Sequence, residues 1–141
     1  MLFRSLMFSC GILAKQSDQD AAALVLSLGN RVKNLGNGND QSVIFLLEAI
    51  NECKRNKDDF HLQLARCFGG NLNQRSLLLC FQFISEGPTA ILCEAIKVNT
   101  TLTGLVLSRD GISDAGVKSI EAAMKFNKIR TKFTIGWRLT C

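Results

Sequence analysis

The sequence predicts an α/β fold in which short parallel strands alternate with outer helices in a solenoid segment, preceded by a helical N-terminal region. Three observations predict this arrangement. Apolar residues in the second half of the chain recur at a spacing of about 28 residues, and each unit joins strand-type alternation to helix-type periodicity. Apolar residues in the first half recur at helical spacing. Since one unit cannot bury its apolar face alone, neighbouring units are expected to stack.

The 28-residue spacing relates two stretches position by position. The later stretch carries apolar residues and a closing asparagine at Leu102, Leu105, Leu107, Ile112, Ile120, Met124 and Asn127. The earlier stretch has Gln74, Leu77, Leu79, Ile84, Leu92, Ile96 and Asn99 at the matching places. The pattern predicts strands over 77–79, 105–107 and 133–135, with helices over 90–98 and 115–126 between them.

The first half of the chain predicts helices separated by polar or glycine-rich connectors. Apolar residues at helical spacing indicate helices over 17–35, 41–54 and 60–68. We therefore expect three parts: an apolar segment over 1–16 that is a weak signal sequence or unstructured, a helical region over 17–71 that caps the repeats, and repeats over 72–141 with the last one truncated.

Two motifs in the repeats resemble a known family. Residues 97–103 read Lys-Val-Asn-Thr-Thr-Leu-Thr, and residues 112–116 read Ile-Ser-Asp-Ala-Gly. Both resemble the ribonuclease-inhibitor subtype of leucine-rich repeats, which occurs in nucleotide-binding leucine-rich-repeat receptors and in related repeat-only proteins. The resemblance implies a leucine-rich repeat solenoid that recognises proteins through its strand face. It makes a candidate partner surface of Leu78, Val106, Ser108, Arg109, Thr134 and Trp137.

Charge is unevenly distributed along the chain. The net charge is +5, and the basic residues exceed the acidic ones only in the C-terminal part, over 97–141. An anionic partner such as nucleic acid would explain this excess. Solvated lysines on exposed helix faces would also explain it, and the basic residues do not form one stripe. A nucleic-acid partner is therefore the less favoured explanation.

The six cysteines indicate a reducing compartment. They include no Cys-x-x-Cys pair, and Cys67, Cys80 and Cys93 lie in apolar surroundings, where free thiols behave as small hydrophobic side chains. We therefore expect a cytoplasmic protein. Secretion is the alternative, because the N-terminal apolar segment has the outline of a signal peptide. No apolar run is long enough to span a membrane.

No motif in the sequence indicates catalysis. His61 is the single histidine, and the chain has no phosphate-binding loop, no Gly-x-Ser-x-Gly and no His-Glu-x-x-His. We expect a chain that is not an enzyme, with no catalytic, cofactor-binding or metal-binding residues. The predicted function is that of a protein–protein interaction module, a non-catalytic leucine-rich repeat scaffold or a fragment of a larger receptor or regulator. The alternative is polyanion binding by the basic C-terminal half, and self-association through an uncapped C-terminal edge is a further expectation.

Overall fold

The computed structural model describes residues 19–20, 23, 27, 41–54, 58–72, 75–79, 84–108, 111–127 and 134–138, with residues 41–42, 78, 108 and 134–138 described by their backbone alone. Seven elements follow one another along the described chain. They are α3 (Gln41–Glu52), α4 (Phe60–Asn71), β1 (Ser76–Leu79), α5 (Glu86–Val98), β2 (Gly104–Ser108), α6 (Asp114–Phe126) and β3 (Thr134–Arg138).

The three strands form one parallel sheet in the order β1-β2-β3. Leu77 pairs with Leu105 and Leu79 with Leu107, and all four side chains are buried. Helices α5 and α6 are the crossover connections that parallel pairing requires. The alternation of strand residues therefore places one face of the sheet against these two helices.

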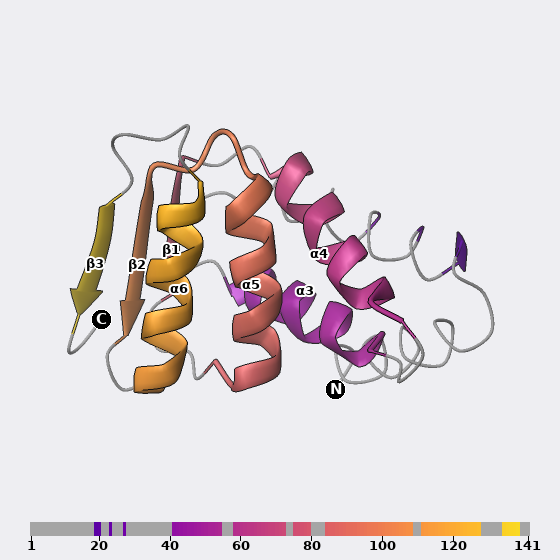
Figure 1. Cartoon of the computed structure of the whole chain (residues 1–141), viewed down its shortest axis with the longest axis horizontal. Helices are drawn as coiled ribbons and strands as arrows, with labels where there is room; N and C mark the ends of the chain where they lie inside the picture. The colour runs from indigo at the N-terminus through magenta and orange to yellow at the C-terminus, as the bar shows by residue number, and fades with distance from the viewer. Residues whose placement is uncertain are drawn as a thin grey trace.

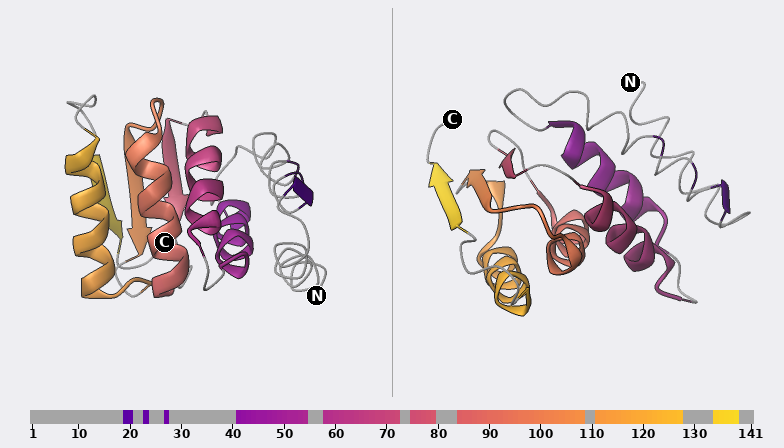
Figure 2. Two further views of the ribbon diagram at one scale, coloured as in Figure 1. Left: turned by 45° about the vertical axis from the view of Figure 1, so that its right-hand side comes forward. Right: turned by 90° about the horizontal axis from the view of Figure 1, so that it is seen from above.

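Two layers are visible when the molecule is seen from above (Figure 2). One layer holds the three strands and then α3, and the other holds α6, α5 and α4. Figure 1 shows α4, α5 and α6 side by side, with the sheet behind them. Helices α4 and α5 pack closely, because a Cβ added to Gly69 of α4 would overlap the carbonyl oxygen of Ala95 in α5. Glycine at this position therefore sets how near the two helices approach.

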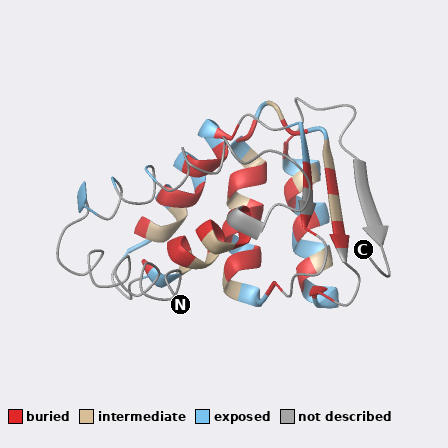
Figure 3. Cartoon of the chain, turned by 180° about the vertical axis from the view of Figure 1, so that it is seen from behind, coloured by how far each residue is buried: buried red, intermediate tan, exposed pale blue. Residues whose placement is uncertain are grey.

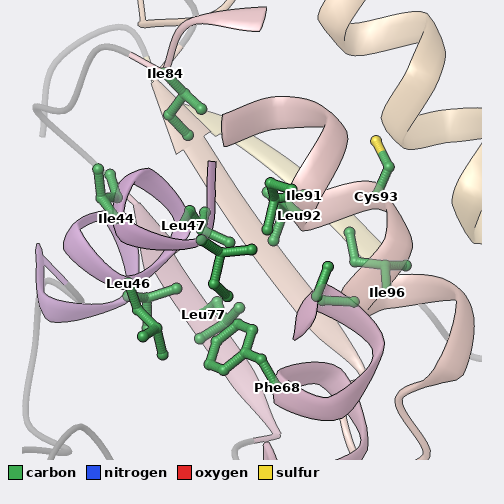
Figure 4. Packing of buried hydrophobic residues seen from close by; sticks show 14 of the residues in the cluster. Ile44, Leu46, Leu47, Phe68, Leu77, Ile84, Ile91, Leu92, Cys93 and Ile96 are labelled. Carbon is green, nitrogen blue, oxygen red and sulfur yellow. The ribbon is translucent and has the colours of Figure 1, made fainter. Parts of the chain in front are cut away.

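The hydrophobic core fills the space between the layers (Figure 4). Ile44 and Leu47 of α3 and Phe68 of α4 pack there against Leu77 of β1 and Leu92 of α5. Figure 3 shows the buried positions of the helices on the sides that face one another. Seven residues of α5 are buried but only three of α6, because α5 has helices on both sides whereas the only described helix beside α6 is α5.

The expectation of a leucine-rich repeat solenoid is wrong for the described chain. The described elements are mostly helical: four helices of 12 or 13 residues stand against three strands of four or five. One repeat spacing back from β1, residues 48–51 lie in α3 rather than in a further strand. Helix α3 packs on α4 and α5, so the apolar faces are buried by helix–helix packing and not by continued stacking of strand–helix units. The repeat architecture implied by the resemblance to the ribonuclease-inhibitor subtype is wrong for the same reason.

Individual helices agree more closely with the sequence. The sequence predicts helices over 41–54, 60–68, 90–98 and 115–126, and they occur at Gln41–Glu52, Phe60–Asn71, Glu86–Val98 and Asp114–Phe126. Of the helix expected over 17–35, the four described residues 19, 20, 23 and 27 are all helical. None of the described helices is long and apolar enough to cross a membrane.

The third strand is shifted from its expected register. Ile135 pairs with Leu105, whereas the 28-residue spacing places Ile135 opposite Leu107. The connector over 127–133 before β3 is two residues longer than the connector over 99–103 before β2. A shift of two residues leaves the same set of positions on each face of the strand. Apolar periodicity therefore could not reveal it.

Two buried asparagines, Asn99 and Asn127, hydrogen-bond the end of one helix to the end of the helix before it. The Nδ2 of Asn99 donates to the carbonyl oxygens of Gly69 and Leu72, both at 2.8 Å. The Nδ2 of Asn127 donates in the same way to Ile96 and Asn99, again at 2.8 Å. Both side chains are buried. Since the last carbonyls of a helix have no partner one turn further along the helix, each asparagine supplies donors to carbonyls at or just after the end of the preceding helix.

Candidate functional site

Five of the six residues expected to contact a partner lie on the strands of the sheet. Leu78 and Val106 pair across β1 and β2, and Gly136 of β3 continues that row. Val106 is half-buried, between the fully buried Leu105 and Leu107. Arg109 lies outside the described residues. The six residues remain a prediction that the described geometry does not test.

The register gives the places of the remaining strand residues. Thr134 pairs with Gly104, and Ser108 pairs with Arg138. Trp137 occupies the row of Leu79 and Leu107, two residues whose side chains are buried. Gly136, not Thr134, is in the row of Val106. On β3, the residue that continues the line of Leu78 and Val106 is thus different from the one expected from the sequence.

A shallow groove lies between α5 and α6 on the outer side of the helical layer. Its volume is about 410 Å³, and its residues come from one side of each helix: Ala90, Cys93, Glu94 and Lys97 of α5, with Ser119, Ala122, Ala123 and Phe126 of α6. One end is bordered by the small side chains of Ala90 and Ser119. The other end is bordered by Lys97 and by Phe126, whose side chain is 67% exposed.

An ion-pair network borders the groove on its α5 side. The Oε2 of Glu94 accepts from the Nε of Arg66 at 3.2 Å, and its Oε1 accepts from the Nζ of Lys97 at 3.0 Å. The Lys97 ammonium also lies 5.5 Å from the centre of the Phe126 ring, which is cation–π geometry. These contacts hold Lys97 between a carboxylate and an aromatic ring and so fix one end of the groove.

Two titratable groups of the groove are held in single protonation states near neutral pH. Burial raises the pKa of the Cys93 thiol to about 11, so the nucleophilic thiolate is scarce. Burial acts to raise the pKa of Glu94 as well, but the hydrogen bonds and charges of Lys97 and Arg66 outweigh it and lower that pKa below its usual value. Cys93 is therefore a neutral side chain and Glu94 an ionised one, which suits binding better than proton transfer.

His61 is a further described side chain that could take part in acid–base chemistry; it belongs to α4 and does not line the groove. Its Nδ1 is buried and has no hydrogen-bond partner among the described residues. Burial lowers the pKa of the imidazole, and the charge of Lys54 adds to that effect. A search of the described part of the chain finds no group of three or more side chains that could hold a metal ion. Cys67 and Cys93 are free thiols.

Sequence reasoning did not identify this groove. It treated Phe126 as the end of a helix, and the nearest available signal was the 28-residue spacing that separates Arg66 from Glu94 and Lys97 from Lys125. Spacing of that kind indicates which residues share a helix face. It does not indicate which faces stay uncovered, and that depends on the packing of α3, α4 and α5.

Comparisons with known proteins add no assignment. A scan against protein-family models finds no matching family, and searches of curated proteins and of solved structures find no match.

Proposed function

We propose that this chain is a non-catalytic protein-interaction module that binds a protein partner through the α5–α6 groove. The observation that carries the proposal is Phe126, a large aromatic side chain that is 67% exposed at the end of an open groove. Aromatic residues beside small apolar ones are common anchors in protein interfaces. The described core buries most other large apolar side chains, so the exposure of Phe126 is specific to this site.

The chemistry of the groove supports binding over catalysis. Its carboxylate is neutralised by two cations, and its thiol is protonated. A catalytic group needs a pKa near the working pH, and neither of these pKa values is moved toward neutrality. A side chain that is already paired can still contribute to an interface by fixing the shape of the groove.

The proposal includes a reducing, cytoplasmic location. The free thiols of Cys67 and Cys93 support it, since such thiols persist where disulfides are kept reduced.

The test is quantitative affinity capture from cells that express the protein, with the intact chain as bait. Phe126→Ser removes the exposed ring, and Val98→Ser is the matched control because Val98 is 38% exposed and does not line the groove. We expect Phe126→Ser to lose the captured partners and Val98→Ser to keep them, with both variants retaining the circular dichroism of the parent. Equal capture by all three proteins would contradict the proposed surface.

Polyanion binding is the competing outcome. Binding through the basic residues would fall steeply as salt increases, because it depends on the release of counterions. Capture that is abolished by nuclease treatment or moderate salt, and is insensitive to Phe126→Ser, would favour nucleic acid over a protein partner.

A further inference from the structure

Helices α5 and α6 carry the same pattern of charge along their length. Each has an acidic residue in its first turn, Glu86 or Asp114, and a lysine in its last turn, Lys97 or Lys125. The helices are parallel crossovers of one parallel sheet, so both acidic ends lie at one end of the helical face and both lysines at the other. The face therefore has an acidic end and a basic end.

The shape of the groove changes in the same direction. Ala90, in the second turn of α5, lies towards the acidic end, Ser119 lies midway along α6, and Phe126 stands at the basic end. If a second copy packs on this face after a two-fold rotation about an axis perpendicular to the helices, the acidic end of each copy meets the basic end of the other. The large side chain at the basic end then meets the small side chains of the other copy. Such self-complementarity is what a two-fold interface between identical chains requires.

Resting on the proposed function, we propose that the partner in this groove is a second copy of the same chain. The two copies pack α6 against α6 in antiparallel orientation, with the two-fold axis at the level of Ser119 and Ile120. Residues equally far from the axis then face each other, so Asp114 of each copy faces Lys125 of the other. Phe126 of each copy is directed towards the small-residue end of the other copy's groove.

The available charges fit this arrangement. Asp114 and Lys125 are both exposed, and neither forms an ion pair with another described residue. They stand at opposite ends of α6, roughly 16 Å apart along its axis, so they cannot pair within one copy. Pairing between copies would form two ion pairs, one at each end of the interface.

The size of the face predicts a weak association. Two 13-residue helices are about 20 Å long and together about 20 Å wide, so each copy contributes on the order of 400 Å². A total of about 800 Å² belongs with small, transient interfaces. We therefore expect a monomer–dimer equilibrium with a dissociation constant in the range of roughly ten to several hundred micromolar.

Sedimentation of the purified full chain over about 5 µM to 1 mM tests the proposal. We expect a mass that rises towards the dimer with concentration, and a monomer throughout for Phe126→Ser. Asp114→Lys and Lys125→Glu should each raise the dissociation constant about tenfold, because each sets like charges against one another at both ends of the interface. The double variant Asp114→Lys/Lys125→Glu should restore the parent value.

Rescue by the double variant separates this proposal from a structural role, since the two residues are too far apart to interact within one chain. Lys54→Glu is the control for net charge, because Lys54 is exposed after α3 and leaves the face unchanged. A monomer at every concentration, or a double variant no better than the single ones, would overturn the inference. If either result were found while capture from cells still depended on Phe126, the proposed function would stand and the partner would be a different protein. If capture also failed, both would be rejected.

Discussion

Asn99→Ala is the substitution whose cost can be calculated most directly. The Asn99 side chain is 3% exposed and takes part in four short hydrogen bonds to the backbone. It donates to Gly69 and Leu72 at 2.8 Å and accepts from the amides of Thr101 and Leu102 at 2.9 and 2.6 Å. Alanine removes all four bonds and leaves buried backbone groups without them.

The expected loss of stability follows from these contacts. A hydrogen bond of this kind contributes about 1 kcal/mol net, and an unpaired buried group costs about 1–3 kcal/mol. The Leu72 carbonyl keeps a second donor, the hydroxyl of Thr101 at 2.7 Å, so its loss is partly compensated. We therefore expect Asn99→Ala to lower the free energy of unfolding by about 3 kcal/mol, a large share of the roughly 5–15 kcal/mol typical of a domain.

Asn71→Ala is the matched control. Asn71 stands one repeat spacing before Asn99 but is exposed, and its Nδ2 donates to the carbonyl of Cys67 in its own helix rather than to another element. We expect this variant to lose no more than about 0.5 kcal/mol. Urea denaturation followed by circular dichroism measures both. A loss below about 1 kcal/mol for Asn99→Ala, or equal losses for the two variants, would rule out the stabilising role of the buried asparagine.

Of three further predictions, the first two use neighbouring or equivalent residues as controls and the third uses pH. Gly69→Ala should destabilise the chain by about 1–3 kcal/mol, because its Cβ would overlap the backbone of α5. Gly70→Ala, with nothing within 4 Å of the new Cβ, should be neutral or stabilising in thermal melts. Ser113→Ala should lower the free energy of unfolding by about 1 kcal/mol, because the Ser113 side chain accepts from the Gly116 amide. Ser85→Ala should lower it by less, because the Ser85 side chain makes no such bond, and urea titration of both variants measures the difference. The pKa of Glu94 is lowered in the folded chain, so its contribution is present above the carboxylate's ordinary pKa of 4.5 and is lost as pH falls below it. The melting temperature of Glu94→Gln should therefore be closer to that of the parent at acidic pH than at neutral pH. A difference in melting temperature that did not become smaller on acidification would contradict this.

Short-range features were well predicted from the sequence. The helices expected over 90–98 and 115–126 end where α5 and α6 end, and Asn99 and Asn127 follow directly as their C-caps. Capping, proline placement and apolar periodicity act within one or two helical turns, so they can be recognised without knowledge of the fold. The start of α6 is capped by Ser113, whose side chain accepts from the amide of Gly116.

Pairing between distant residues was predicted only where the spacing was undisturbed. The β1–β2 register follows the 28-residue spacing, whereas the β2–β3 register does not, since the connector before β3 is longer. The extension of the pattern to a solenoid failed for a related reason. Helix α3 has an apolar face that α4 and α5 can bury, and periodicity does not state whether a helix or another strand will cover a given surface.

The order of amino acids was enough to establish which segments are helical, which residues of each segment are apolar and how β1 pairs with β2. Three features depend on the packing of the whole chain: α3 lies in the layer of the strands, Asn99 hydrogen-bonds the end of α4, and Phe126 is exposed beside a groove. The difference arises because periodicity encodes the direction in which an apolar side chain points within its own element. Whether that side chain is then covered depends on the neighbours that other parts of the chain bring to it.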